Sequence, residues 1–402
     1  MSESGSPLTV GITGPRGFIA GHLVRYLSAG VARSDSIQTA APKKTQQQQG
    51  TVHSGRKIRI SSCPRQTFSD MAALFEFVET CDTIVHLAGT SCGSEREIYE
   101  SSTILVDKLI EALEATNCRP HVVFPSSPHR DRTNAFGRSK KYAEGKLREW
   151  AARTGAPLTI LVVPSVYGPG CRPYRNSAVA TFCHQLAHDQ QPVVINDEEL
   201  DLVWINDLVD AIGQIISARR FGIHEARVAT SARLRASQLL DKLQAIRDSY
   251  FAENVVPDLS DPFDVSLYTT FFSSIDLDDH CRRPRLQNDA QGQLFEVLRL
   301  AGGGQIFFST IKPGVIRGNH FHSRKVERFC VVRGEAVIRI RQVGEERVRE
   351  FHVSGGSPEF ISVPALCTHQ IENVGKEDLL TMFWCNEIFQ PGDPDTFFEK
   401  VA

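Results

Sequence analysis

The sequence has almost no excess charge of either sign, and this limits the partners that we expect. Its 402 residues include 45 basic and 47 acidic side chains, for a net charge of −2. A protein that binds nucleic acid usually carries a basic patch or a strongly positive balance. We therefore expect no nucleic-acid partner.

Long apolar runs and an export signal are also missing. No apolar stretch approaches the roughly 20 residues that a membrane-spanning helix needs. The first ten residues, MSESGSPLTV, lack the basic-then-apolar order of a signal peptide. The ten cysteines include no CxxC pair, and scattered cysteines in a long chain without an export signal indicate reduced thiols. We expect a cytoplasmic protein with no membrane partner.

The length of the chain predicts more than one domain, since one domain usually takes about 100–200 residues. A proline-containing stretch separates two different sequence patterns, and it predicts a connector at residues 251–285. The flanking domains are then expected at residues 1–250 and 286–402. Within the first domain, residues 34–55 are polar and of low complexity, which predicts a disordered insertion.

A glycine-rich turn follows the first apolar strand, Leu8–Ile12. In the run GITGPRGFIAGHL, Gly11, Gly14 and Gly17 let the backbone approach a ligand closely, and Ala20 fills the last small position of the pattern. The helix that begins there points its first N–H groups outward, which is how proteins hold a dinucleotide pyrophosphate. The pattern predicts a nicotinamide dinucleotide site.

The charges near this turn bear on which dinucleotide is bound. No acidic residue ends the second strand, Lys57–Ser61, and Arg65 follows instead. Arg65 together with Arg16 in the glycine turn favours a 2′-phosphate, and hence NADP(H) over NAD. The alternative for Arg65, a solvated surface charge, stays open.

Strands and helices then alternate along the first domain. Asp82–Gly89, His121–Phe124 and Leu158–Val163 read as buried strands, and Ile104–Ala115 has helical spacing. This alternation predicts an α/β class with a doubly wound parallel sheet of Rossmann type. From residue 286 on, short strands separated by glycine turns predict an all-β antiparallel sandwich or barrel.

The second domain contains a pattern of metal-binding side chains. His320 and His322 lie two residues apart, so on a strand they share a face. Glu327 and His369 complete a set of three imidazoles and one carboxylate, which suits Zn²⁺ or another divalent metal. The alternative is that these are surface histidines, since the chain has thirteen. We predict a metal site at His320, His322, Glu327 and His369, with His320 and Glu327 also catalytic.

The motifs of the first domain resemble a known family. The TGxxGxxA turn, HLAG at 86–89, FGRSK at 136–140 and WINDLVDAI at 204–212 are similar to extended short-chain dehydrogenases/reductases, the NAD-dependent epimerase/dehydratase family. The predicted cofactor contacts are Gly11, Gly14, Arg16, Gly17, Phe18, Ile19, Arg65, Leu87, Ala88 and Lys140.

The resemblance implies two catalytic residues for hydride transfer. That family uses a Ser or Thr and a Tyr-x-x-x-Lys motif, in which the phenol gives a proton to the developing alkoxide. Ser127, or Ser126 if the register slips by one, matches the serine, and Lys140 matches the lysine. The tyrosine position holds Phe136, which cannot exchange a proton. Tyr142 lies six residues on and faces another direction on a helix.

The second domain resembles a cupin. The whole chain resembles the bifunctional reductase–epimerases of the N-acetyl-L-fucosamine branch of capsular polysaccharide synthesis, through GNHFH, THQIEN and the final FWCNEIFQPGDPDTFF. The resemblance implies a nucleotide-linked keto sugar as substrate, inversion at C3, and a homodimer. Cupins usually place a glycine two residues after the proline of their second motif. Here Pro364 is followed by Ala365 and Leu366, so Leu366 stands in place of that glycine and the turn is expected to differ.

Three functions follow from these features. The leading hypothesis is metal-assisted C3 epimerisation of a nucleotide-linked 4-keto-6-deoxyhexose, followed by NADPH-dependent reduction at C4. Phe136 leaves open an epimerase with a silent nucleotide domain. It also leaves open a non-catalytic sensor that binds NADP(H) and a sugar.

Overall fold

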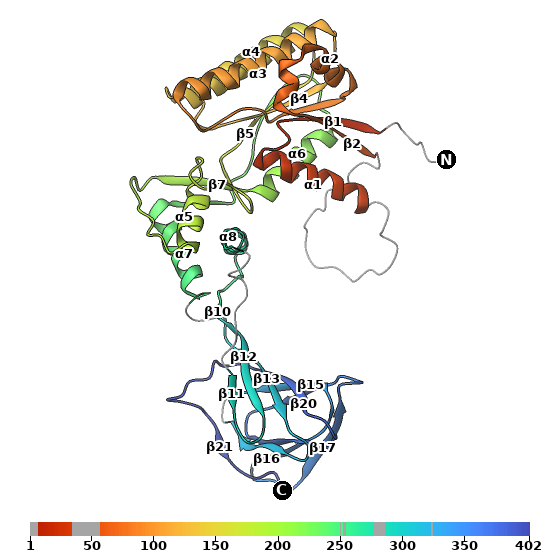
Figure 1. The fold of residues 1–402 in the computed structure, drawn as a ribbon, viewed down its shortest axis with the longest axis vertical. Coiled ribbons are helices and arrows are strands. Elements are labelled where there is room, and N and C mark those ends of the chain that lie inside the picture. Colours follow the sequence, from red (N-terminus) through yellow and green to blue (C-terminus); the bar gives the residue numbers. More distant parts are fainter. Residues whose placement is uncertain (1–6, 34–56, 250, 252–254, 277–285, 323–324) are drawn as a thin grey trace, which may run out of the picture. The chain divides into compact units, whose positions relative to one another are not determined.

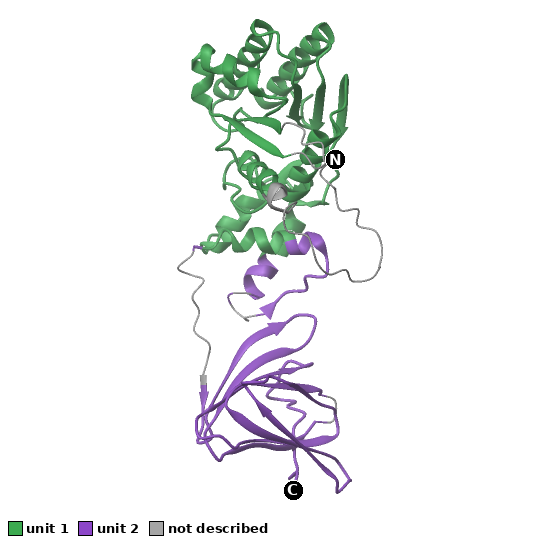
Figure 2. Cartoon of the chain, turned by 90° about the vertical axis from the view of Figure 1, so that its right-hand side faces the viewer, with its two compact units in different colours: residues 1–243, 266–275 green, residues 244–265, 276–402 purple. Residues whose placement is uncertain are grey.

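The computed structural model describes residues 7–33, 57–249, 251, 255–276, 286–322 and 325–402. They form two compact units, one with residues 1–243 and 266–275 and the other with residues 244–265 and 276–402 (Figure 2). The insertion predicted at 34–55 lies outside the described residues. The stretch predicted as a connector contains a short strand, β10 (Val255–Val256), and a helix, α8 (Pro262–Phe272).

The first unit is built on a six-stranded parallel sheet with the order β2-β1-β3-β4-β5-β8 (Figure 1). These strands are almost wholly apolar where both sheet faces are covered, as in Val122–Phe124 of β4. The doubly wound α/β fold predicted from the sequence is confirmed. The strands are β1 (Leu8–Thr13), β2 (Ile58–Cys63), β3 (Thr83–His86), β4 (His121–Ser126), β5 (Leu158–Val162) and β8 (Ile223–Arg227).

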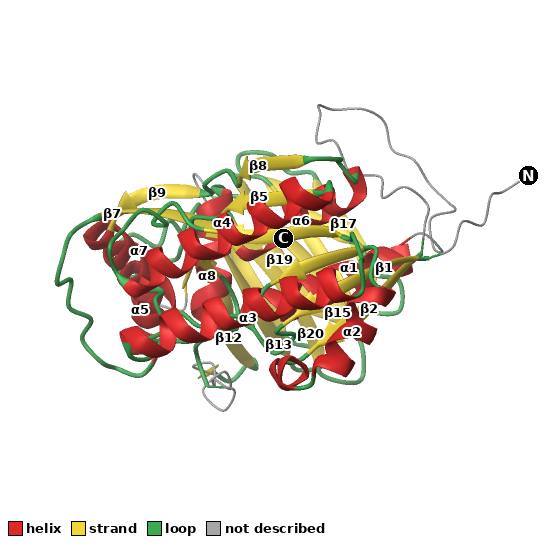
Figure 3. Ribbon diagram, turned by 90° about the horizontal axis from the view of Figure 1, so that it is seen from above, coloured by secondary structure: helices red, strands yellow, loops and turns green. Residues whose placement is uncertain are grey.

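Helices cover both faces of this sheet (Figure 1). Figure 3 shows the same helices in red, seen from above. On one face α1 (Phe18–Arg33) and α6 (Ile205–Ala218) pack on the strands. On the other face lie α2 (Met71–Thr80), α3 (Glu95–Ala115) and α4 (Ala135–Thr154), with the large core side chains of Leu147 and Trp150. The 3-10 helix η1 (Arg65–Ser69) leads from β2 into α2.

The chain order of the strands creates a switch point in this sheet. After β1 the chain adds β2 on one side and then crosses to add β3 on the other side of β1. Ligands of open α/β sheets bind beyond the carboxyl ends of the strands at such a point. The glycine turn follows β1 and is therefore at the switch point.

A small three-stranded sheet belongs to the same unit and was not predicted from the sequence. It joins β6 (Ser165–Tyr167), β7 (Glu199–Trp204) and β9 (Ala232–Arg235) in that order. Its strands have only three to six residues, too short for a clear alternation of polar and apolar residues. The helices α5 (Ala178–Ala187) and α7 (Ala236–Asp248) precede and follow its last two strands.

The second unit contains the all-β domain, residues 286–402, and confirms the antiparallel fold predicted there. One sheet has the order β10-β12-β13-β20-β15-β18, with β11 paired to β12, and the other has the order β17-β16-β19-β14-β21. The strands of residues 286–402 are β11 (Leu286–Asn288), β12 (Gln293–Leu300), β13 (Gln305–Ile311), β14 (Ile316–Phe321), β15 (Glu327–Arg333), β16 (Glu335–Gln342), β17 (Val348–Ser354), β18 (Phe360–Val363), β19 (Cys367–Asn373), β20 (Leu379–Cys385) and β21 (Phe397–Phe398).

The core of the β domain shows which side of each sheet faces inward. Ile311, Phe329 and Val331 from one sheet pack with Ile338 and Ile371 from the other. Side chains alternate along a strand, so residues of the same parity on β13, β15 and β19 share this inner face. In the described part of the chain, no helix is both long and apolar enough to cross a membrane.

Candidate metal centre and dinucleotide site

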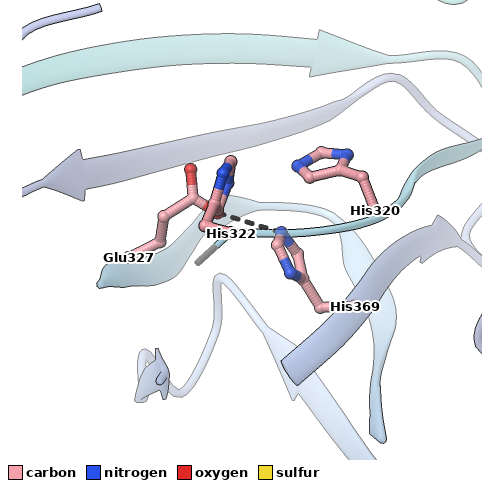
Figure 4. Close-up of side chains that lie close together, drawn as sticks. All are labelled: His320, His322, Glu327 and His369. Carbon is pink, nitrogen blue, oxygen red and sulfur yellow. Dashed lines mark ion pairs between the residues drawn. The ribbon is translucent and has the colours of Figure 1, made fainter. Parts of the chain in front are cut away.

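Three histidines and one glutamate converge in the β domain (Figure 4). Their potential ligand atoms, from His320, His322, Glu327 and His369, all lie within 4.8 Å of one another. The Nε2 of His369 is 2.9 Å from Glu327 Oε2, and the Nε2 of His322 is 3.5 Å from the same oxygen. The structure thus brings together the four residues predicted from the sequence.

The register of two strands places the first pair of these ligands. His320 on β14 stands directly opposite His369 on β19, and their ring centroids are 4.6 Å apart. A bulge at Gly318 and Asn319 interrupts the register just before His320, and such bulges re-aim the side chains that follow. Gly318 has a φ of +108°, and a Cβ there would lie 2.6 Å from the His369 carbonyl oxygen.

The other two ligands come from the ends of strands. His322 lies just beyond β14, which ends at Phe321, and Glu327 is the first residue of β15. Glu327 points inward from its sheet, as does Phe329, whose ring centroid is 5.8 Å from that of His369. His322, Glu327 and His369 are buried, and His320 is partly exposed. One edge of the cluster is therefore accessible.

The imidazoles and the carboxylate of the cluster shift one another's pKa values. Burial raises the pKa of Glu327, but hydrogen bonding and charge from His322 and His369 outweigh this and hold it well below its usual range. Burial lowers the pKa of His322, but Glu327 outweighs that effect and raises it. Burial, helped by the nearby His369, lowers the pKa of His320 to about 4. His320 is thus neutral at pH 7, as a metal ligand must be.

Two buried atoms of the cluster support a metal. His322 Nε2 and Glu327 Oε2 are buried and make no hydrogen bond of regular geometry, since only the close ion pairs of 3.5 and 2.9 Å link Oε2 to the two imidazoles. Such buried atoms are almost always paired in folded proteins. Three imidazole nitrogens and a carboxylate oxygen are the donor set of Zn²⁺ and related divalent metals. The residues present therefore fit a divalent metal.

Backbone carbonyls orient two of the imidazoles. The Nδ1–H of His322 donates to the Asp395 carbonyl oxygen at 2.5 Å, and the Nδ1–H of His369 donates to the Cys367 carbonyl oxygen at 3.3 Å. In the neutral imidazoles, both bonds place the proton on Nδ1 and leave Nε2, the nitrogen that faces Glu327, able to bind a metal. Metal-binding histidines usually have such a partner, which fixes the tautomer and the ring orientation.

Asp395 is itself fixed by the loop that carries His322. Its carboxylate accepts the backbone N–H of Lys325 at 3.2 Å, and the Lys325 ammonium donates to the Pro394 carbonyl oxygen at 2.6 Å. Asp395 is buried and has a φ of +45°. Asp395 was not predicted from the sequence, because it acts on His322 through a backbone carbonyl that any residue type would provide.

The turn before β19 has a left-handed backbone conformation at Leu366. Leu366 has a φ of +60°, in the left-handed region that favours glycine. Its N–H donates to the His322 carbonyl oxygen at 2.7 Å. Leu366 therefore holds a backbone angle that favours glycine, and the expected difference from the turn of cupins stays a prediction.

In the first unit, the glycine turn meets the end of β3. Gly14 has a φ of +67°, and a Cβ there would lie 3.0 Å from Ala88 Cα. The Ala88 N–H donates to the Thr13 hydroxyl at 2.9 Å, which ties the end of β3 to the end of β1. Gly17 closes the turn with an N–H bond to the Gly14 carbonyl, directly before α1. This is a cradle of the kind that holds a pyrophosphate.

The remaining predicted cofactor contacts lie around this turn. Phe18, Ile19 and Leu87 are partly buried against the sheet. Gly11 lies within β1, where a Cβ would come within 2.5 Å of Cys81 Sγ, so the structure explains it by packing. Arg16 and Arg65 are exposed and follow the adjacent parallel strands β1 and β2.

The serines and the lysine of the predicted reductase site lie at the end of β4 and on α4. The Ser126 hydroxyl donates to the Glu144 carboxylate, and Ser127 Oγ accepts the His129 N–H at 3.1 Å. The Lys140 ammonium donates to the Pro125 carbonyl oxygen at 2.8 Å. Ser126 is thus occupied by Glu144, which leaves Ser127 as the better match for the catalytic serine.

Phe136 lies beside the lysine whose partner would be a tyrosine. The Lys140 ammonium is 5.8 Å from the centre of the Phe136 ring and 4.7 Å from that of Phe124. Burial lowers the pKa of Lys140 to about 8, against an opposing effect of Glu144. Tyr142 donates to Asp107 of α3 instead, so it does not replace the missing phenol.

His86 and Glu144 belong to the same cluster and were not identified as site residues from the sequence. His86 Nδ1 is 3.0 Å from the Thr13 hydroxyl, and burial together with the charge of Lys140 lowers the pKa of His86 to about 3. Glu144 stands four residues after Lys140 on α4 and pairs with Arg130 at 3.1 Å. The four-residue helical spacing was a usable signal for Glu144.

Comparison with known protein families gives two matches. Residues 10–228 match the NAD dependent epimerase/dehydratase family, and residues 287–397 match the polysaccharide biosynthesis C-terminal domain. The two matched regions contain the dinucleotide cradle and the histidine–glutamate cluster, respectively.

Two individual relatives cover most of the chain, and a third covers about two thirds of it. A UDP-2-acetamido-2,6-beta-L-arabino-hexul-4-ose reductase of Pseudomonas aeruginosa is 30% identical over 87% of this chain and 95% of its own length. The crystal structure of the capsular polysaccharide assembling protein CapF from Staphylococcus aureus superposes with a TM-score of 0.81 at 29% identity, over 98% of this chain and 100% of that one. The fold is shared with UDP-glucose 4-epimerase of Thermotoga maritima. That structure superposes with a TM-score of 0.51 at 16% identity, over 66% of this chain and 98% of its own.

Proposed function

The chain belongs to the NAD dependent epimerase/dehydratase family, and we propose that it modifies a nucleotide-linked sugar at one site in each unit. The enzyme is of the nucleotide-sugar epimerase/reductase type. The β domain inverts C3 of a nucleotide-linked 4-keto-6-deoxyhexose. The first unit reduces the C4 ketone with NADPH if the site altered by Phe136 is active.

The observation that carries the epimerase proposal is the cluster of His320, His322, Glu327 and His369. A divalent metal bound there would polarise a carbonyl as a Lewis acid. In a 4-keto sugar, the C–H bonds at C3 and C5 are acidified by the neighbouring carbonyl, so removal of the C3 proton and its return on the opposite face inverts C3. The protein supplies fixed imidazole tautomers, through Asp395 and Cys367, and a mostly buried site with one accessible edge.

The reductase proposal depends on the cradle and on Lys140. Gly14, Gly17 and the start of α1 would hold the pyrophosphate, and exposed Arg16 and Arg65 favour a 2′-phosphate, hence NADP(H). Reduction needs a hydride at C4 and a proton on the carbonyl oxygen. Phe136 cannot supply that proton, and this favours the second candidate, an epimerase whose nucleotide domain is silent.

A deuterium-exchange experiment tests these proposals together. Purified protein is incubated with a UDP-linked 4-keto-6-deoxyhexose in deuterated water, with and without zinc and NADPH. We expect deuterium at C3 without NADPH, detected by NMR and mass spectrometry. His369→Ala is the matched variant and should lose the exchange, while Lys140→Met should keep it.

The outcomes separate the candidates. Exchange together with NADPH oxidation supports both activities, and exchange alone supports the epimerase with a silent domain. A lack of exchange even with added zinc would contradict catalysis in the β domain and leave the sugar-binding sensor. The predicted homodimer stays a prediction and is measured by light scattering on the same sample.

A further inference from the structure

One buried polar atom in the β domain is not explained by the metal cluster. In the described part of residues 286–402, four buried side-chain atoms lack a hydrogen-bond partner: Gln305 Oε1, Arg317 Nε, His322 Nε2 and Glu327 Oε2. The last two face the proposed metal. Arg317 is anchored through its other nitrogens, which donate to Asp289 at 2.5 Å and to Ser309 at 3.4 Å. Gln305 is 2% exposed, and an unpaired amide oxygen at such a place needs a reason.

The strand register places Gln305 in the same row as a metal-site residue. Cys385 on β20 pairs with Glu327 on β15 on one side and with Gln305 on β13 on the other. Gln305 in turn pairs with Arg299 on β12. Gln305 has the same parity as Ile311, a core residue of β13, so it belongs to the inner face. Gln305 and Glu327 are therefore side chains of one face, separated by a single strand.

The next row of inward-facing side chains on this sheet is aromatic, and two of its three rings are only partly buried. Phe329, Phe383 and Phe307 stand opposite one another, with stacked centroids 5.5 and 5.0 Å apart. Phe307 and Phe383 are only partly buried, although they point to the inside of the domain. The side chains next to Gln305 on the inner face are thus not fully covered by the protein. The aromatic row reaches His369, whose ring centroid is 5.8 Å from that of Phe329.

The backbone holds Gln305 at this position. Gly304, directly before it, has a φ of +97°, and a Cβ there would lie 2.8 Å from the Cys385 carbonyl oxygen. Only a glycine fits this close approach, and it fixes where β13 begins next to β20. The side chain of Gln305 is therefore presented from a rigid strand rather than from a loop.

From these observations we propose that Gln305 recognises the C2 acylamino group of the keto sugar, its Oε1 accepting the amide N–H. The inference rests on the proposed function of the β domain. An amide oxygen can only accept a hydrogen bond, and the N–H of an acylamino group can only donate one, so the two match. The Phe307 ring beside Gln305 offers an apolar surface to the acyl methyl group.

The spacing of the strands is compatible with this arrangement. Gln305 and Glu327 are two inter-strand spacings apart, about 10 Å. That span accommodates the ring of a sugar whose keto oxygen lies at the metal site and whose C2 substituent points toward Gln305. A buried acceptor also rejects a sugar without the donor, because the oxygen is then left unpaired.

The test pairs a change in the protein with a change in the sugar. Two probes are compared: a UDP-2-acetamido-2,6-dideoxy-4-keto-hexose, and the same sugar with hydrogen at C2. The rate of deuterium incorporation at C3 gives kcat/KM for the wild type, for Gln305→Leu and for Gln370→Leu. Gln370 is the matched control, since it is buried on β19 but has the opposite parity to His369.

We expect Gln305→Leu to lower kcat/KM for the acetamido probe roughly 10- to 100-fold, and to leave the 2-deoxy probe within about threefold. Gln370→Leu should change neither. Zinc content and thermal unfolding of Gln305→Leu must match the wild type. Equal losses with both probes, or no loss with the acetamido probe, would overturn the inference.

A failure of the proposed function is distinguishable from a failure of this inference. If the wild type exchanges no deuterium with either probe, the epimerase proposal fails. The dissociation constant of the acetamido probe, measured by calorimetry on the zinc-loaded full chain, then decides the role of Gln305. A weaker binding in Gln305→Leu that is confined to this probe supports recognition, and an unchanged constant rejects it.

Discussion

Asp395 offers a direct test of how the metal site is held. It contacts no predicted ligand through its side chain, but its carbonyl oxygen accepts the Nδ1–H of His322 and its carboxylate accepts the Lys325 N–H. Replacing Asp395 with alanine removes the second bond. The backbone at φ +45° is also less favourable for alanine than for aspartate.

The expected loss of zinc affinity in Asp395→Ala can be worked out from these contacts. Loss of the hydrogen bond to the Lys325 N–H and the poorer backbone fit each destabilise the native position of the Asp395 carbonyl oxygen by about 1 kcal/mol. Loss of a partner that orients a histidine ligand typically lowers metal affinity by about 10- to 100-fold. We therefore expect Asp395→Ala to bind zinc at least tenfold more weakly. Asp395→Asn keeps an acceptor oxygen and tolerates a positive φ, so its affinity should stay within about threefold.

Metal affinity is measured on the purified, metal-stripped full chain by competition with a chromogenic zinc chelator at constant pH. Circular dichroism shows whether each variant is folded. Wild-type affinity in Asp395→Ala would refute the reasoning, and so would an equal loss in both variants. His369→Ala, which removes a predicted ligand, sets the lower limit of the measurement.

Three further predictions concern other parts of the chain. Phe136→Tyr should raise NADPH-dependent reduction of the 4-keto sugar if the cradle binds cofactor productively, and the control Phe136→Leu should not. NADPH oxidation is followed by absorbance at 340 nm. An unchanged absorbance with both variants would mean that the reductase site has lost more than its tyrosine. Burial lowers the pKa of His86 to about 3, so the neutral side chain contributes its full stability above the unfolded-state pKa of about 6.5. This contribution falls from pH 6.5 toward pH 3 by up to about 1.4 kcal/mol per pH unit. The free energy of unfolding of His86→Asn should therefore fall less steeply with decreasing pH than that of the wild type, and equal slopes would contradict this. Leu366→Gly should stabilise the β domain by roughly 0.5–1 kcal/mol in urea unfolding, because glycine relieves the positive φ, whereas Leu366→Ala should not.

Several features of the protein could be predicted because their signals are local in the sequence. The change from alternating strands and helices to short strands with glycine turns predicted both fold classes. The turn at Gly14 and Gly17 is defined by residues that are neighbours in the chain. The replacement of a tyrosine by Phe136 is visible in the motif itself and already weakens the prediction of a reductase.

The metal site was predictable in its residues but not in its geometry. His320 and His322 share a motif with Glu327, whereas His369 reaches the cluster only because β19 pairs with β14 in one particular register. The bulge at Asn319 shifts that register by one residue, and no spacing rule in the sequence indicates it. The positions of the ligands had to come from the folded sheets.

The sequence by itself determined the class of each domain and the types of residue that could do chemistry, because periodicity, glycine turns and short motifs depend on near neighbours. Only the tertiary structure decided which distant groups assist them. The Asp395 carbonyl has no sequence signal, and Gln305 resembles any other glutamine of a strand until β20 places it in a row with Glu327. Strand pairing and burial are long-range properties of the folded chain, and they convert these ordinary residues into parts of a site.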